Sequence, residues 1–187
     1  MTDEELVKGC IAKNQSAQKT LFEKFNRKMM GICLRYAERT EEADDMLQNG
    51  FIRVFEKIET FRADGSLEGW VRKIVVNESL TWLRKNKASK MNIDIDDAKY
   101  SIPGNNHVGE NVNEKDLLKM IQALPVGFRT VFNMYAIEGY THKEIGEMLG
   151  ISEGTSKSQY SRAKGHLQNM LKAETEKNIA KEKVVGN

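Results

Sequence analysis

Two helices joined by a short turn are encoded between Tyr140 and Leu171, in the sequence YTHKEIGEMLGISEGTSKSQYSRAKGHLQNML. Thr141, followed three residues later by Glu144, forms a capping-box pattern that marks a helix start. Gly150 suits the left-handed conformation that ends this helix, and Ser152 is placed to cap the next one. These signals predict a helix-turn-helix.

The second helix of this pair has two different sides when its residues are placed 100° apart. The predicted buried stripe contains Ser156, Tyr160, Ala163, Leu167, Met170 and Leu171. Ser156 stands out because such motifs normally place an apolar residue there. The opposite side has no acidic residue and consists of Gly154, Thr155, Ser158, Ser161, Arg162 and Gly165, with Lys157 and Lys164 on its flanks. Short polar side chains and one arginine suit base edges, while lysines suit phosphates, so this side is predicted to enter a major groove. The alternative is a solvated amphipathic helix in a helical bundle, which the turn signals make weaker.

The composition is that of an ordinary folded protein. Of its 187 residues, 40% are hydrophobic and 30% charged, and the net charge is +2. Nucleic-acid binding must therefore depend on local basic clusters. The acidic N-terminus MTDEELVKGC leads us to expect no secretory signal. No apolar run has membrane-spanning length, so we expect no membrane insertion.

Cysteines and histidines form no recognisable site in the sequence. Cys10 and Cys33 are far apart, and His107, His142 and His166 are scattered. We interpret Cys33 as a small core residue. The expectation is a reduced, cytoplasmic protein without a metal or another cofactor.

Helical periodicity organises the first part of the chain. Apolar residues recur along one side from Ala17 to Tyr36, and a second helix is predicted to start at Thr40. Asp45, Gln48 and Asn49 lie beside the apolar stripe of this second helix, where the core does not need polar groups.

The segment FRADGSLEGW, from Phe61 to Trp70, interrupts this periodicity. Asp64, Gly65 and Ser66 form a turn signal, and Ser66 can cap a helix that runs to about Lys87. This helix carries Arg72, Lys73, Asn77, Arg84, Lys85 and Lys87, with Trp82 among them. Basic and aromatic residues together suit single-stranded nucleic acid, although a solvated basic face over a buried tryptophan explains the pattern equally well.

The predicted fold is all-α, with two small helical domains joined by a flexible acidic linker. We place the first domain at residues 1–87, the linker at 88–112 and the second domain, which ends in the helix-turn-helix, at 113–175. A charged tail follows at 176–187, and we expect the chain to fray after Leu171.

Taken together, these motifs resemble a bacterial RNA polymerase sigma factor of the extracytoplasmic-function (ECF) type. The resemblance covers about Ala17–Lys87 and Val112–Leu171 and rests on ADDMLQNGFIRVF, FRADGSLEGWVRKIVVN, LPVGFRTVF and HKEIGEMLGISEGTSKSQYSRAK in that order. It implies that the first domain binds the clamp helices of core RNA polymerase and melts the promoter −10 element. It also implies that the second domain reads the −35 element and contacts the polymerase flap.

The resemblance assigns roles to residues at matching positions. Polymerase binding falls on Asp45, Gln48 and Phe51, while Asn49 departs from the acidic residue common there. Recognition of the −10 element falls on Arg62, Asp64, Gly65, Ser66, Trp70, Arg72, Lys73, Asn77 and Arg84. Recognition of the −35 element falls on Thr155, Lys157, Ser158, Ser161, Arg162 and Lys164.

Two other classes of protein compete with this reading. An ordinary dimeric helix-turn-helix regulator explains Tyr140–Leu171 but gives no role to FRADGSLEGW. An enzyme is weaker still, because no nucleophile–base pair, phosphate loop or metal-ligand cluster is evident, so we expect no catalysis. The sequence leaves open whether an anti-sigma factor holds the chain.

Overall fold

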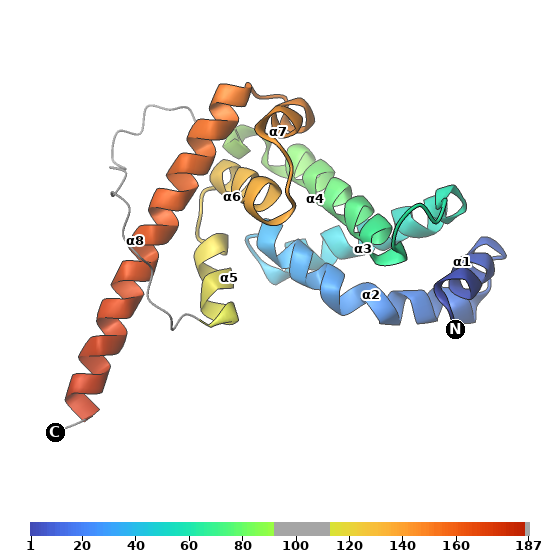
Figure 1. The fold of residues 1–187 in the computed structure, drawn as a ribbon, viewed down its shortest axis with the longest axis horizontal. Helices are drawn as coiled ribbons and strands as arrows, with labels where there is room; N and C mark the ends of the chain where they lie inside the picture. The colour runs from blue at the N-terminus through green and yellow to red at the C-terminus, as the bar shows by residue number, and fades with distance from the viewer. Residues whose placement is uncertain (92–112, 186–187) are drawn as a thin grey trace. The chain divides into compact units, whose positions relative to one another are not determined.

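The computed structural model describes residues 1–91 and 113–185 (Figure 1). The chain divides into two compact units, Met1–Asn86 and Lys87–Asn187. Every regular element within the described ranges is helical, which confirms the all-α prediction. Most of the predicted acidic linker, residues 92–112, lies outside the described residues. None of the helices in the described ranges is both long and apolar enough to cross a membrane.

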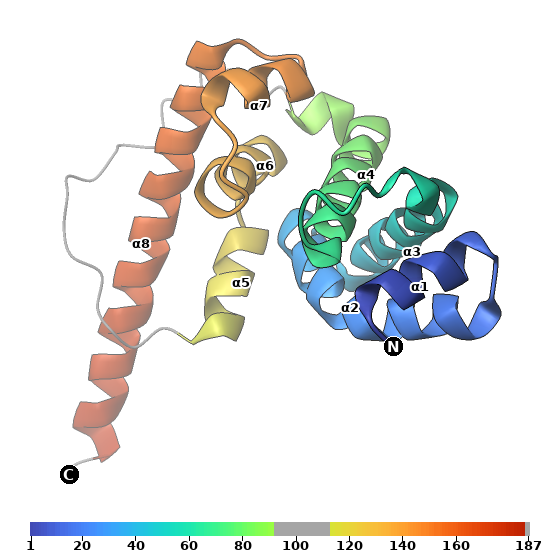
Figure 2. The same ribbon diagram turned by 45° about the vertical axis from the view of Figure 1, so that its right-hand side comes forward.

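The first unit contains four α-helices and one short 3-10 helix. They are α1 (Asp3–Ile11), α2 (Gln15–Tyr36), α3 (Thr40–Lys57), η1 (Ile58–Thr60) and most of α4 (Leu67–Met91), which is kinked at Lys87, where the first unit ends. The sequence analysis missed α1, although Thr2 and Glu5 form a capping box at its start and Leu6 and Cys10 are buried. This helix lies beside α2, as Figures 1 and 2 both show.

Helices α3 and α4 approach each other closely at one point of the first unit. A side chain at Gly50 of α3 would place its Cβ 3.0 Å from a methyl group of Val75 on α4, so the two helices approach where a glycine leaves room. Cys33 is fully buried in the core of this unit, as predicted. Burial raises its thiol pKa to about 12, so the group remains protonated at neutral pH.

The second unit packs three helices and a π-helical turn against one long helix. These are α5 (Glu114–Gln122), α6 (Val126–Phe132), η2 (Asn133–Ile137), α7 (His142–Leu149) and α8 (Glu153–Val185). Figure 2 shows α5, α6 and α7 along α8. The buried residues of this core include Met120, Ile121, Leu124, Phe128, Ala163 and Leu167.

The helix-turn-helix has the local geometry that the sequence predicts. Thr141 and Glu144 form the capping box of α7, and Gly150 ends the helix with a φ of 70° in the left-handed region. The Oγ of Ser152 accepts a hydrogen bond from the Thr155 amide (2.9 Å) at the start of α8.

The end of the helix-turn-helix differs from the expectation. Helix α8 does not stop near Leu171 but continues to Val185. The prediction of fraying was wrong because alanine, glutamate and lysine, which dominate this segment, all have high helix propensity.

Candidate nucleic-acid interface

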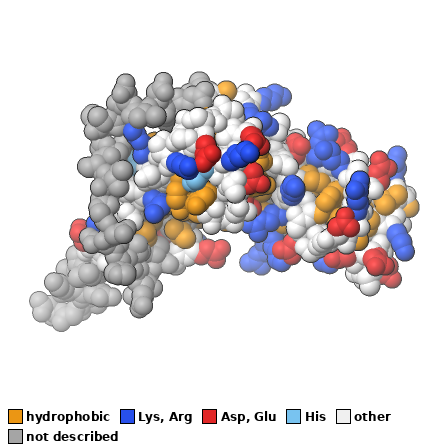
Figure 3. All heavy atoms as spheres, turned by 45° about the horizontal axis from the view of Figure 1, so that its top comes forward, with side chains coloured by type: hydrophobic (Ala, Val, Ile, Leu, Met, Phe, Trp, Pro, Cys, Tyr) orange, Lys and Arg blue, Asp and Glu red, His pale blue; other side chains and the backbone are white. Residues whose placement is uncertain are grey.

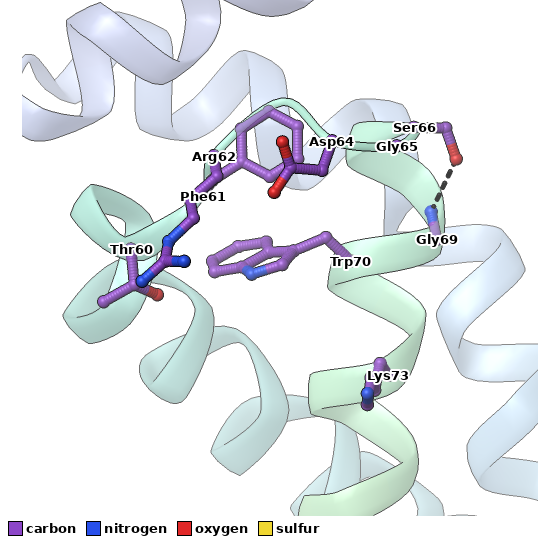
Figure 4. Close-up of a pocket in the computed structure, with 9 residues that line it drawn as sticks. All are labelled: Thr60, Phe61, Arg62, Asp64, Gly65, Ser66, Gly69, Trp70 and Lys73. Carbon is purple, nitrogen blue, oxygen red and sulfur yellow. Dashed lines mark hydrogen bonds between the residues drawn. The ribbon is translucent and has the colours of Figure 1, made fainter.

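A pocket of about 390 Å³ opens where the chain passes from η1 into α4. It is lined by Thr60, Phe61, Arg62, Asp64, Gly65, Ser66, Gly69, Trp70 and Lys73 (Figure 4). The local fold forms because the Oγ of Ser66 accepts a hydrogen bond from the Gly69 amide (3.1 Å), which fixes the first turn of α4. The structure thus gathers six of the predicted −10 residues around one cavity.

Two aromatic rings form a wall of this loop pocket. Phe61 and Trp70 meet edge to face, with ring centroids 5.6 Å apart and an interplanar angle of 61°. Figure 4 shows the Arg62 guanidinium on one side of the indole, the Asp64 carboxylate above it and Lys73 one turn further along α4. An aromatic wall with cations at its edge suits an unstacked nucleobase whose ring can stack while its phosphate is neutralised.

Helix α4 continues this surface away from the pocket. Lys73, Asn77 and Arg84 follow Trp70 on one side of α4, since they are separated by spacings that return to the same helix face. Arg72 lies about 160° further round the helix from Trp70, on the side that packs on the core. Arg72 and Lys73 are adjacent in the sequence and were therefore assigned to one surface. On a helix, however, adjacent residues point about 100° apart.

The predicted polymerase-binding residues of α3 differ in their exposure to solvent. Asp45 and Gln48 are exposed, whereas Phe51 is only 3% exposed. The Phe51 ring meets Phe22 with centroids 4.7 Å apart. Phe51 is thus part of the core under this surface, and Ile52, which is 50% exposed, is the apolar group beside Gln48. The sequence analysis missed Ile52 because it lies outside the apolar stripe of α3 and, being apolar, is not among the polar residues that suggested a binding surface.

The predicted −35 residues share the outer side of α8. Lys157 and Lys164 are exposed, while Thr155, Ser158, Ser161 and Arg162 are partly exposed. The Lys164 Nζ also lies 5.8 Å from the Tyr160 ring centroid. Gly165, by contrast, is buried rather than exposed. Hydroxyl groups and one guanidinium at this face can contact base edges.

An acidic residue lies closer to this face than the sequence predicts. Glu153, in the first turn of α8, pairs with Lys157 at 2.6 Å. The pairing lowers the pKa of Glu153, so this carboxylate is ionised at neutral pH. Because residues four apart are neighbours on a helix, Glu153 reaches a lysine on the edge of the outer face. A phosphate that binds Lys157 must displace this partner.

Metal binding has no candidate ligand set in the part of the chain that is described. No group of three His, Cys, Asp or Glu side chains in residues 1–91 and 113–185 is placed to hold a metal ion. The sequence analysis did not single out three of the residues that line the loop pocket, Thr60, Phe61 and Gly69. Of these, Phe61 contributes an aromatic wall. It begins the interrupted segment Phe61–Trp70, but its contact with Trp70 forms only when the loop folds back.

Comparison with known protein families accounts for both units. Residues 21–89 match Sigma-70 region 2, and residues 114–167 match Sigma-70, region 4. The loop pocket lies within the first match and the helix-turn-helix within the second.

Curated relatives extend the similarity along most of the chain. ECF RNA polymerase sigma factor SigM of Mycobacterium tuberculosis is 28% identical over 170 residues, which are 91% of this chain and 85% of that protein. ECF RNA polymerase sigma-E factor of Haemophilus influenzae is 25% identical over 183 residues, which are 91% of this chain and 96% of that protein.

The fold is also found among solved structures. One example is the sigma factor RpoE in complex with the anti-sigma factor NepR from Bartonella quintana, with a TM-score of 0.51 and 20% identity. The match covers 82% of this chain and 96% of that one. With both sigma-70 regions present in order and full-length ECF relatives, the chain belongs to the sigma-70 family as a factor of the ECF type.

Proposed function

We propose that this chain binds core RNA polymerase, recognises the −35 and −10 elements of promoters and assists strand opening at the start of transcription. One observation carries this proposal: a single chain holds two different candidate DNA surfaces. The loop pocket beside α4 suits an unpaired base, and the outer side of α8 suits the major groove of a duplex.

The first unit captures the non-template strand in this proposal. A base leaves the stack and enters the loop pocket against Trp70, where Arg62 and Lys73 neutralise the neighbouring phosphates. Asn77 and Arg84 extend this path along α4. Asp64, Gly65 and Ser66 shape the pocket, and Arg72 stays outside the path because it lies on the other side of the helix.

The polymerase holds the chain at two places. Asp45 and Gln48 contact the clamp helices from the exposed side of α3, and Phe51 supports that surface from the core. The second unit contacts the flap. A groove of about 400 Å³ between α5 and α8, lined in part by Met120 and Met170, supports an apolar contact of this kind.

The second unit reads the −35 element through α8. Thr155, Ser158, Ser161 and Arg162 contact base edges, while Lys157 and Lys164 contact phosphates. Recognition and strand opening need no catalytic group from the chain, so we propose that it is not an enzyme. It acts with the polymerase in the cytoplasm, and an anti-sigma factor is a possible further partner.

The test combines polymerase binding with promoter selection. The full chain is mixed with core polymerase from its own organism, and transcripts from a pool of random DNA fragments are sequenced. We expect start sites that share two upstream elements at a fixed spacing.

Variants of α3 provide the control for polymerase binding. Asp45→Ala and Gln48→Ala should weaken co-purification with core polymerase. Glu4→Ala removes the same charge as Asp45→Ala from an exposed position on a different helix, α1, so it should bind normally. A chain that binds a palindromic site as a dimer without polymerase, and starts no transcription with it, would instead be an ordinary regulator.

A further inference from the structure

A polar pair connects the two helices of the helix-turn-helix. Ser156 of α8 is 0% exposed, at a position where such motifs normally carry an apolar residue. Its Oγ lies 2.9 Å from the Nδ1 of His142, the first residue of α7, and the two atoms share a hydrogen bond. This bond lies on the buried side of α8, directly behind the residues proposed to read DNA.

Aromatic contacts hold the imidazole of His142 in place. Tyr135 stacks on it, with centroids 4.1 Å apart and an interplanar angle of 8°. Tyr160, one turn after Ser156, lies 5.8 Å from it at 57°. Figure 3 shows a partly exposed histidine with hydrophobic side chains beside it. The stack fixes the plane of the ring, and the hydrogen bond to Ser156 selects the orientation in which Nδ1 faces α8.

The hydrogen bond restricts α8 more tightly than apolar packing does. Apolar packing is non-directional and does not by itself select one rotation of a helix about its axis. A helix with its side chains has a radius of roughly 5–6 Å, so a 20° rotation about its axis moves the side chains by about 2 Å. A hydrogen bond tolerates only a few tenths of an ångström. The His142–Ser156 bond therefore excludes rotations that would misplace a base contact.

We propose that the hydrogen bond between His142 and Ser156 fixes the rotation of α8 about its axis and thereby sets which bases Thr155, Ser158 and Arg162 contact. This inference rests on the proposed reading of DNA by α8. His142 and Ser156 are positioning residues in this proposal, because they act through the side chains of α8 that read DNA. The class of ligand is a duplex whose major groove receives α8.

A purely structural bond would have different consequences. Its loss would lower stability and weaken binding to every sequence alike. Loss of a positioning bond lowers the ratio of the affinity for the preferred sequence to the affinity for unrelated sequences. The reason is that phosphate contacts from Lys157 and Lys164 tolerate a small rotation of α8, whereas base contacts do not.

The chain offers matched substitutions at both ends of the bond. Ser156→Ala removes the hydroxyl group, and Ser156→Thr retains it. His142→Asn places an amide where Nδ1 was, whereas His142→Gln places it near the position of Nε2. Both His142 variants lose the stack on Tyr135, so the difference between them reports the hydrogen bond alone.

The test uses the full chain bound to core polymerase. Wild-type complex first selects a preferred −35 element from duplexes randomised in that segment. Dissociation constants are then measured on this fragment and on the same fragment with the element scrambled. We expect Ser156→Ala and His142→Gln to lower the ratio of the two affinities by at least about fivefold, the low end for one lost base contact.

Further outcomes separate the inference from its alternatives. Affinity for the scrambled fragment should change by less than about twofold, and Ser156→Thr and His142→Asn should retain most of the ratio. Equal losses on both fragments, or equal behaviour of the Asn and Gln variants, would overturn the positioning role. If Ser156→Ala melts before the assay temperature, the two His142 variants decide the question. If wild type selects no element at all, the proposed function fails and this inference falls with it.

Discussion

Replacing Trp70 with alanine tests the central claim about the loop pocket. The indole forms part of the pocket wall and meets Phe61 at 5.6 Å. A base stacked on an aromatic side chain contributes about 1–3 kcal/mol, which corresponds to roughly 5- to 150-fold in affinity. The lost contact with Phe61, worth about 0.5–1.5 kcal/mol, lowers the free energy of unfolding of the first unit instead.

The assay compares two states of one promoter fragment with the chain–polymerase complex. Fluorescence anisotropy gives the affinity for the closed duplex at low temperature and for a fragment whose −10 segment is unpaired. Trp70→Ala should weaken only the second, and Trp70→Phe should retain most of that affinity. Trp82→Ala is the matched control, because Trp82 lies about 120° round α4 from Trp70.

An abasic site at the captured nucleotide isolates the stacking contact. Wild type should lose affinity on this fragment, and Trp70→Ala should lose nothing further, since the two changes remove the same interaction. Additive losses would show that Trp70 does not contact that base. Equal weakening on closed and unpaired DNA would likewise refute the assignment of the pocket.

Three further predictions concern the second unit. Arg162→Ala should cost about 1–3 kcal/mol and relax preference at one base pair, whereas Lys164→Ala should weaken binding to all sequences alike; a uniform loss in both would contradict the assignment of the helix face. Glu153→Gln should release Lys157 from its ion pair. The affinity for any duplex should then rise, and the slope of log affinity against log salt concentration should steepen by about 0.9. An unchanged slope in a salt titration would argue against a phosphate contact at Lys157. Burial lowers the pKa of His142 and of His166 below the ordinary 6.5. As the pH falls through 6.5, the unfolded chain therefore binds more protons than the folded chain, and the melting temperature should drop. Replacing both His142 and His166 with asparagine should make the melting temperature less dependent on pH. If the dependence in thermal melts were unaltered, the two histidines would be excluded as its cause.

Local sequence determined the start of α7 and the turn of the helix-turn-helix. The capping box of Thr141 and Glu144 and the left-handed Gly150 occur where the sequence predicts them. The turn before α4 was also evident, because Ser66 caps the helix from a neighbouring position. Each of these features depends on hydrogen bonds and backbone angles within a few residues, so a short stretch of sequence is sufficient to encode it.

Tertiary structure decided which residues share a surface. Phe51 is in the core rather than beside Asp45, because α2 brings Phe22 against its ring. Phe61 joins Trp70 in one pocket only when the loop folds back. The hydroxyl group of Ser156 is buried with a hydrogen-bond partner because His142, fourteen residues earlier, lies beside it. These contacts join separate segments, and the direction of each side chain follows from how the helices pack.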